Sequence, residues 1–258
     1  MNAKIAQVAE IVRTHAPLVV AYSGGVDSTC LLALAHRAAG DRVLAVIADS
    51  PSLPRAALAE ALENARLIGA RVEVLATQEF SNEDYLVNPP NRCYFCKAEL
   101  FTQLDRLASE RNYAAIAYGE NADDRADLRP GSRAAREFAV IAPLRDAGLT
   151  KSDVRAISRD LGLPTHDAPA QPCLSSRIPH GTRVTSEALA LVEHGEAFVR
   201  KMGFRVFRVR YMAGPPVGAR VQISPMELPA MIGRENELIA GLSSVGFQTI
   251  EIDPEGYR

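Results

Sequence analysis

The chain has 258 residues, 47% of them hydrophobic and 23% charged, as in an ordinary globular protein of one large or two small domains. Its formal net charge of −2 excludes a general electrostatic attraction to nucleic acid or to anionic membranes. No apolar run approaches the roughly 20 residues that span a bilayer. The amphipathic N-terminus lacks a secretory signal pattern, so we expect a cytoplasmic protein without structural disulfides.

Strand and helix patterns alternate along the first two-thirds of the chain. Near-continuous apolar strands separated by helical stretches favour a parallel sheet covered on both faces. The expected strands are 18–22, 43–48, 72–75 and 114–118, and the expected helices are 28–39, 55–68, 97–111 and 151–161. The charged stretch 121–137 is expected to be a surface loop over the carboxyl edge of the sheet. Residues 1–163 are therefore predicted to form an α/β, Rossmann-like domain that binds ATP.

The last third of the chain has a different pattern. Residues 164–185 are rich in Pro, His, Ser and Cys and are interpreted as an active-site linker. The patterns beyond it indicate, in order, helix 186–202, strands 204–211 and 219–223, helix 225–239 and strand 248–252. Residues 186–258 are accordingly predicted to form a small α+β domain.

A phosphate-binding loop is predicted where the first strand meets the first helix, at Ser23-Gly24-Gly25-Val26-Asp27-Ser28. Two glycines let the backbone approach a ligand closely, and successive N–H groups at a helix N-terminus attract anions. The two serines supply hydroxyl donors, and Asp27 can orient the loop or help to hold Mg²⁺. The loop matches neither the Walker A pattern nor Gly-x-Gly-x-x-Gly.

Three of the four cysteines are candidate metal ligands. Cys93 and Cys96 stand three residues apart just before a predicted helix, and Cys173 lies in the linker. The spacing alone leaves zinc, a redox dithiol, an iron–sulfur cluster and inert buried thiols open. Zinc would need a fourth ligand, which His166 or His180 could supply. Cys30, inside the first predicted helix, is expected to be a core residue.

Further polar residues are candidate ligands for Mg²⁺, for phosphate or for an anionic substrate. Asn121, Asp123 and Asp124 follow a strand end and offer the oxygen ligands that Mg²⁺–pyrophosphate prefers, although a solvated loop would have the same pattern. Lys97 and Lys151 are candidate phosphate clamps, or surface charges. Arg177, Arg208 and Arg210 are candidates for an anionic substrate, because alternate residues of a strand share one face.

The loop Ser23–Ser28 resembles the PP-loop (N-type) ATP pyrophosphatase superfamily, and other segments resemble its LarE-type sulfur transferase branch. The matching segments are 23–28, 48–51, 91–97, 119–124, 143–144 with 148–151, 172–177 and 208–210, so that the resemblance covers most of the chain. The branch more often has His where Met212 stands and Glu where Gln222 stands.

The resemblance implies a reaction and a set of site residues. A carboxylate of pyridinium-3,5-dicarboxylate mononucleotide is adenylated and sulfur replaces an oxygen, for a nickel-pincer nucleotide cofactor. Sulfur comes either from the cysteine matching Cys173 or, in relatives with all three cysteines, from a sulfide on a [4Fe–4S] cluster; we expect the cluster. The implied ATP-binding residues are Ser23, Gly24, Gly25, Asp27, Ser28, Asp49, Ser50, Lys97, Gly119, Asn121, Asp124 and Lys151. The implied catalytic residues are Cys173, Asp27, Ser176 and Arg177, the substrate ligands Arg177, Arg208 and Arg210, and the cluster ligands Cys93, Cys96 and Cys173.

Other functions compatible with the motifs are a tRNA thiolase and an amide-forming synthetase of the same superfamily. The charge balance disfavours nucleic acid as a partner, and an amide synthetase would not need three cysteines. A catalytically silent nucleotide-binding protein is disfavoured by the intact loop and the cysteine set. The expected partners are thus a small-molecule mononucleotide and, by family resemblance, further copies of the chain, with no membrane.

Overall fold

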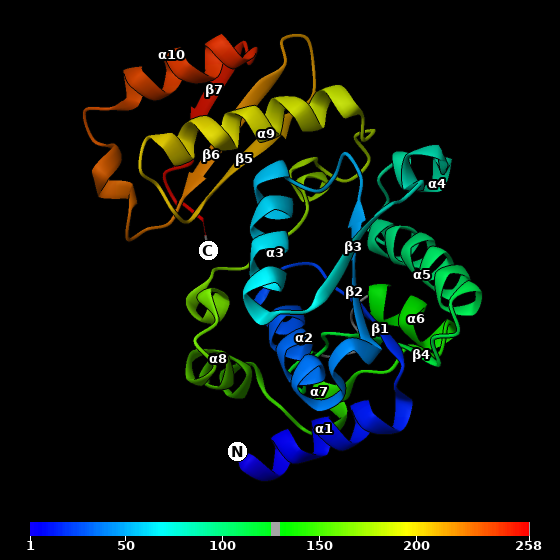
Figure 1. Ribbon diagram of the computed structural model, residues 1–258. Coiled ribbons are helices and arrows are strands. Elements are labelled where there is room, and N and C mark those ends of the chain that lie inside the picture. Colours follow the sequence, from blue (N-terminus) through cyan, green and yellow to red (C-terminus); the bar gives the residue numbers. More distant parts are fainter. Residues whose placement is uncertain (125–129, 258) are drawn as a thin grey trace. The chain divides into compact units, whose positions relative to one another are not determined.

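The computed structural model describes residues 1–124 and 130–257, and its contacts divide the chain into two units (Figure 1). The first unit comprises Met1–Asn82 and Asn91–Gln171, and the second comprises Glu83–Pro90 and Pro172–Arg258. This division differs from the expected boundary at residue 163. The segment 164–171 stays with the first unit, where Arg155 donates hydrogen bonds to the carbonyl oxygens of His166 (2.8 Å) and Ala168 (2.9 Å).

The first unit is built on a four-stranded parallel sheet of order β3-β2-β1-β4. Its strands are β1 (Leu18–Ala21), β2 (Val43–Asp49), β3 (Arg71–Ala76) and β4 (Ala115–Tyr118). Its helices are α1 (Asn2–His15), α2 (Val26–Ala39), α3 (Arg55–Ile68), α5 (Arg92–Glu110), α6 (Pro130–Glu137), α7 (Pro143–Asp146) and α8 (Lys151–Asp160). The predicted α/β sheet is thus confirmed.

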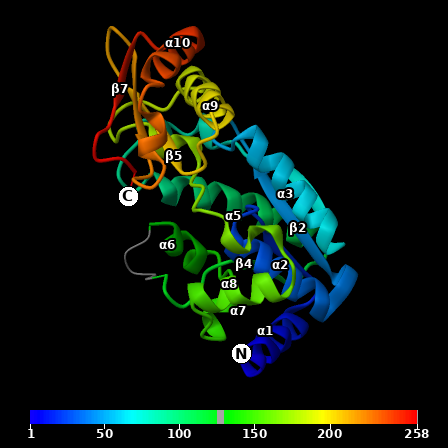
Figure 2. The same ribbon diagram turned by 90° about the vertical axis from the view of Figure 1, so that its left-hand side faces the viewer.

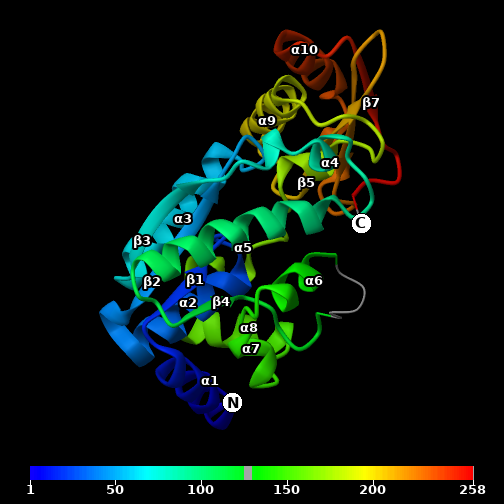
Figure 3. The same cartoon turned by 90° about the vertical axis from the view of Figure 1, so that its right-hand side faces the viewer.

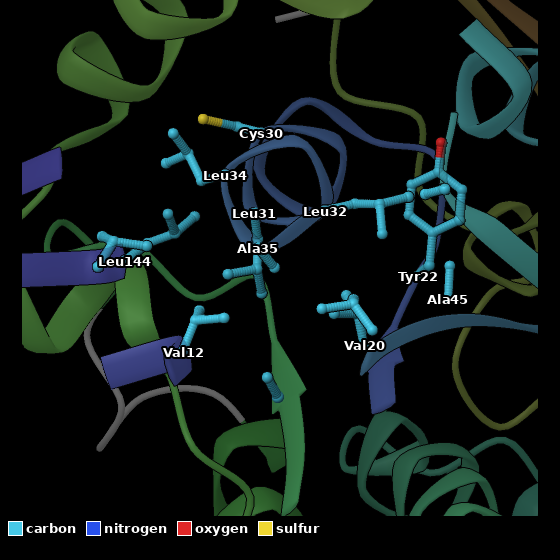
Figure 4. Close-up of a cluster of buried hydrophobic side chains, with 14 of the residues drawn as sticks. Val12, Val20, Tyr22, Cys30, Leu31, Leu32, Leu34, Ala35, Ala45 and Leu144 are labelled. Carbon is cyan, nitrogen blue, oxygen red and sulfur yellow. The ribbon is translucent and has the colours of Figure 1, made fainter. Parts of the chain in front are cut away.

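Alternate residues of the strands enter two separate cores, because successive side chains of a strand point to opposite faces. Val20 and Ala45 pack with α1, α2, α3 and α8 in a core that also holds the buried thiol of Cys30 (Figure 4). Val19 and Leu44 pack against α5 and α6 on the other face (Figure 3). Helices therefore cover both faces, and the carboxyl ends of the strands share one edge of the sheet.

Two of the expected local structures in this unit are wrong. Helix α5 begins at Arg92 instead of residue 97, so Cys93 and Cys96 lie on its first turn. Within the predicted surface loop 121–137, residues 130–137 form helix α6, whose Ala134 and Ala135 are buried against α5. The sequence pattern did not indicate this helix, because its buried apolar pair stands among charged residues. Residues 125–129 of that prediction lie outside the described residues.

The second unit is a small α+β structure, as predicted. Strands β5 (Phe207–Met212) and β6 (Gly218–Ile223) are antiparallel, β7 (Thr249–Ile252) pairs parallel with β6, and helices α9 (Ser186–Lys201) and α10 (Glu235–Val245) pack on this sheet (Figure 2). The short helix α4 (Glu83–Leu86) also belongs to this unit. The expected helix 225–239 is wrong: Gly233, with φ of 80°, interrupts it, and α10 begins two residues later.

Among the residues that the structure describes, no helix combines the length and the apolar character needed to cross a membrane.

Candidate functional site

The loop between β1 and α2 places two glycines directly before the N-terminus of a helix. Gly24 has a φ of 76°, and a Cβ atom on it would lie 2.6 Å from Cβ of Ala61, so only glycine fits there. The Ser28 hydroxyl donates to the Gly25 carbonyl oxygen (3.1 Å) and lies 3.1 Å from Ser23 Oγ. These contacts hold the loop across the N-terminus of α2, where the helix attracts negative charge.

Gly119, at the end of β4, closes this loop from the other side. A Cβ atom on Gly119 would lie 2.7 Å from the backbone nitrogen of Ser28. The backbone of β4 therefore approaches the start of α2 as closely as only a glycine allows. Gly25 differs from both, because the nearest heavy atom to a Cβ there, Ser23 Oγ, is 3.6 Å away.

Asp27 is the centre of a network that collects polar residues from distant parts of the chain. Its Oδ2 accepts from Lys151 Nζ (2.6 Å) and its Oδ1 from Asn121 Nδ2 (3.3 Å). Asp123 Oδ2 accepts from the backbone nitrogen of Lys151 (2.7 Å), and Asp124 Oδ2 accepts from that of Asn121 (3.2 Å). The structure thus brings together Asp27, Asn121, Asp124 and Lys151, four of the predicted ATP-binding residues.

A cavity of about 230 Å³ opens beside this loop. Its polar wall contains predicted site residues, namely Ser23, Gly25, Asp27, Ser28, Lys97 and Gly119. Its apolar wall contains Ala48, which belongs to the matching segment 48–51, and residues that the sequence interpretation missed, namely Ala21, Ile47, Leu53, Leu100, Phe101 and Tyr118. An apolar wall next to the N-terminus of a helix suits a ligand with an apolar part and an anionic part. Spacing rules cannot identify such a wall, because its members look like core residues.

Two other predicted ATP ligands occupy different surroundings. Asp49 pairs with Arg55 (2.6 Å), and the Ser50 hydroxyl is buried 2.8 Å from Ser52 Oγ. Neither Asp49 nor Ser50 is among the described residues that line the cavity, although Ala48 and Leu53 from the same segment are. Lys97 does reach it, with its ammonium 4.9 Å from the centroid of the Tyr118 ring.

Glu120 is a buried acidic residue to which the sequence motifs assigned no role. Its carboxylate is 3% exposed and accepts hydrogen bonds from Tyr118, from Ser132 (2.6 Å) and from Arg145. Burial alone would raise the pKa of Glu120, but the hydrogen bonds from Ser132 and Tyr118 and the charge of Arg145 outweigh it and lower this pKa. Glu120 therefore fixes the cavity residue Tyr118 to helix α6.

We expect Glu120→Gln to lower the free energy of unfolding by about 2 kcal/mol at neutral pH, through the loss of charge-assisted hydrogen bonds. Because the folded pKa lies below the unfolded one, the carboxylate stabilises the fold above about pH 4.3, and this contribution is lost as the pH falls through the folded pKa. Urea unfolding across pH measures the difference. Glu137→Gln, at an exposed ion pair of α6, should change little. A Glu120→Gln effect that stays constant down to acid pH would contradict this assignment.

The predicted metal ligands divide between the two units. Cys93 is exposed and Cys96 half-buried, and their i, i+3 spacing on α5 puts both thiols on one side of its first turn. Cys173 is half-buried and belongs to the second unit. Within either unit, no three His, Cys, Asp or Glu residues among those described are grouped to hold a metal ion. A set of three thiols fits an iron–sulfur cluster with one open iron, but a site shared by the three cysteines stays a prediction.

Arg177 organises the loop that begins at Cys173. Arg177 is 3% exposed and makes a bidentate ion pair with Glu196 of α9, with distances of 2.8 and 3.0 Å. Its Nη1 also donates to the Cys173 carbonyl oxygen (3.0 Å) and to Ser176 Oγ (2.9 Å), while Ser176 Oγ donates to the same carbonyl oxygen (2.8 Å). A guanidinium engaged in this way holds Cys173 in position; the geometry favours this role over a direct contact with substrate.

Arg208 and Arg210 lie near Arg177 and form with it a cluster of positive charge. Arg208 is buried, with its guanidinium carbon 4.5 Å from the centroid of the Tyr257 ring. Burial and the charge of Arg177 lower the pKa of Arg208. Arg210 donates to Gln222 Oε1 (2.9 Å) and to the Ser176 carbonyl oxygen (2.9 Å). With Glu196 as the partner of Arg177, the cluster keeps an excess of positive charge that suits a phosphate.

Comparison with known proteins gives one group of relatives along nearly the whole chain, although no family model matches. The chain is 31% identical over 242 residues to the pyridinium-3,5-bisthiocarboxylic acid mononucleotide synthase of Lactiplantibacillus plantarum, covering 93% of this chain and 87% of the relative. It is 40% identical to an uncharacterised protein of Synechocystis, covering 93% and 89%. It is also 30% identical over 172 residues to one component of the glutamine-hydrolysing GMP synthase of Archaeoglobus fulgidus, covering 62% and 54%.

Proposed function

Because the chain belongs to the LarE-type branch of the PP-loop ATP pyrophosphatases, we propose that it is an ATP-dependent sulfur transferase. It adenylates a carboxylate of a pyridinium-3,5-dicarboxylate mononucleotide and replaces an oxygen of that carboxylate with sulfur. The observation that carries this proposal is the network around Asp27, in which Lys151 and Asn121 converge on the loop Ser23–Ser28 beside a cavity of about 230 Å³.

The ATP half of the reaction uses the first unit. The loop N–H groups and Lys151 hold the β- and γ-phosphates, and the adenine occupies the apolar wall of the cavity. Asp27 and Asp124 would supply carboxylate oxygens to Mg²⁺, which prefers such ligands and would neutralise charge on the phosphates. A substrate carboxylate oxygen attacks the α-phosphorus, the bond to the bridging oxygen breaks, and pyrophosphate leaves with its charge stabilised by the loop.

The sulfur half uses the three cysteines and the arginines near Cys173. A sulfur nucleophile attacks the carbon of the acyl adenylate, and the carbon–oxygen bond to AMP breaks. Arg208 and Arg210 hold the phosphate of the mononucleotide. Cys93, Cys96 and Cys173 would hold a [4Fe–4S] cluster, which would supply the sulfide for the transfer. Arg177 and Ser176 keep the Cys173 loop in place.

The products of the wild-type protein test this proposal. With ATP and the dicarboxylated pyridinium mononucleotide, we expect pyrophosphate, AMP and a thiocarboxylate, identified by ion chromatography and mass spectrometry. ADP and orthophosphate would contradict the reaction type. Stimulation by undermodified tRNA would instead favour a thiolase, and an amide product with ammonia would favour a synthetase of the kind that the GMP synthase relative represents.

Gly25→Val is expected to reduce ATP–pyrophosphate exchange by about 10²-fold, because its side chain occupies the position from which phosphate approaches the loop N–H groups. The fold should tolerate the change, since Gly25 has extended backbone (φ −72°, ψ 164°) and a Cβ atom there would make only an ordinary contact, 3.6 Å from Ser23 Oγ. Equal melting temperatures and unequal exchange rates would support the assignment. Gly24→Ala is the matched control: its positive φ and its contact with Ala61 predict a loss of stability as well. Normal exchange by Gly25→Val would refute the phosphate role of the loop.

A further inference from the structure

The segment Glu83–Pro90 lies between two elements of the first unit in sequence but belongs to the second unit in space. It follows the first-unit strand β3 and precedes helix α5, yet its contacts place it with residues 172–258. Figure 3 allows the reader to follow it from β3 through α4 to the start of α5. We call residues 83–90 the strap. A direct connection from β3 to α5 within the first unit would be shorter, so the contacts that the strap makes in the second unit require an explanation.

Asn88 is the anchor of the strap. Its side chain is fully buried, and its Nδ2 donates to the carbonyl oxygens of Ile178 (3.3 Å), Pro179 (2.8 Å) and Thr182 (3.0 Å). Its own carbonyl oxygen accepts from the backbone nitrogen of Gly181 (3.0 Å). One asparagine thus binds both sides of the turn that follows the Cys173 segment.

Three further contacts join the strap to the same loop. The buried Tyr85 hydroxyl lies 2.7 Å from Ser175 Oγ, two residues after Cys173. The backbone nitrogen of Val184 donates to the Leu86 carbonyl oxygen (2.9 Å), and Arg183 pairs with Glu83. The strap therefore contacts the loop from its beginning to its end.

The other end of the strap leads directly to the cysteine pair. Asn88 is followed by Pro89 and Pro90, and α5 begins two residues later, with Cys93 on its first turn. Consecutive prolines stiffen this link, since each ring fixes its own φ and restricts the residue before it. The link is covalent, so it holds for any arrangement of the two units: five Cα–Cα steps, at most about 18 Å of chain, join Asn88 to Cys93.

We propose that Asn88 is a positioning residue for sulfur transfer. Through the strap, it ties the loop that carries Cys173 to the chain that enters the Cys93–Cys96 turn. This inference rests on the proposed function, in which the three thiols act together. It adds a connection between the two cysteine segments other than the chain from Cys96 to Cys173, which are 77 positions apart in sequence.

The test uses Asn88→Gly in the full-length chain. Glycine accepts the φ of 57° that Asn88 adopts, so this change removes the amide without straining the backbone. Asn112→Gly is the matched control, because Asn112 has the same φ of 57° but is exposed. We expect Asn88→Gly to lower kcat of sulfur transfer by about 10- to 100-fold, because small misplacements of reacting groups have effects of this size. The KM for ATP and the rate of ATP–pyrophosphate exchange should stay at wild-type values.

A second measurement does not depend on activity. Iodoacetamide should alkylate Cys173 faster in Asn88→Gly than in wild type or Asn112→Gly, as followed by peptide mass spectrometry, because the loop is released. Unchanged alkylation together with unchanged sulfur transfer would overturn the proposal. If Asn88→Gly does not fold, Tyr85→Phe removes only the hydroxyl contact with Ser175 and should shift both readouts in the same direction. If wild type itself shows neither exchange nor transfer, the proposed function fails, and the alkylation rates still decide the role of Asn88.

Discussion

Cys173→Ala is expected to abolish sulfur transfer, by about a thousandfold or more, while ATP–pyrophosphate exchange continues. The physical reason is that the two steps of the proposed reaction use residues of different units. Exchange needs the loop Ser23–Ser28 and the network of Asp27, all in the first unit, whereas Cys173 belongs to the second. Parallel assays of exchange and of thiocarboxylate formation measure the two halves separately. Loss of both activities in a folded variant would contradict this division.

The iron content of the cysteine variants and the mass of the wild-type protein after turnover distinguish the two sources of sulfur. If the three cysteines hold a cluster, Cys93→Ala, Cys96→Ala and Cys173→Ala each lose the iron of anaerobically reconstituted protein, about four atoms per chain. Cys30→Ala is the control, because Cys30 is buried in the core, where desolvation raises the pKa of its thiol to about 12. It should keep its iron. If wild-type protein loses the mass of one H₂S at Cys173 after turnover, the cysteine itself is the donor and the cluster assignment is wrong.

Glu196→Ala is expected to destabilise the second unit by about 3–5 kcal/mol, because it leaves the guanidinium of Arg177 buried without its counter-charge. It also removes the acceptor of the Val209 backbone nitrogen (3.2 Å). Urea unfolding followed by probes in each unit measures the change. The Arg177→Met, Glu196→Gln double variant should recover part of this stability, since it removes the unpaired charge and keeps an acceptor for Val209.

The stability and the activity of these variants should separate. The double variant restores folding but no longer fixes the carbonyl oxygen of Cys173, so we expect it to remain slow in sulfur transfer while retaining ATP–pyrophosphate exchange. Full recovery of transfer together with stability would mean that Arg177 only supports the fold. Arg220→Met, at an exposed ion pair with Glu251, is the control and should be close to neutral.

Local sequence patterns were enough to predict the parallel sheet of the first unit, and the motifs were enough to predict the family. Near-continuous apolar strands such as 18–21 and 43–47 have few alternative structures, and a Gly-Gly loop between a strand and a helix has a narrow set of uses. Local rules also predicted α3 to the residue, because its apolar stripe ends at Gly69, whose φ of 79° terminates the helix. These features depend on interactions between residues that are near in sequence.

Other features could not be predicted, because they depend on residues that are far apart in the chain. Asp27 and Lys151 are both visible as candidates, but their 2.6 Å contact joins positions 124 residues apart. Arg177 is a predicted substrate ligand, and its buried ion pair with Glu196 joins positions 19 residues apart. The contacts of the strap could not be predicted, because Asn88 donates to backbone carbonyl groups. Every residue has such a group, so no sequence pattern indicates which ones will be bound. Backbone acceptors and burial are properties of the folded chain, so the residues that position Cys173 emerge only once the chain is folded.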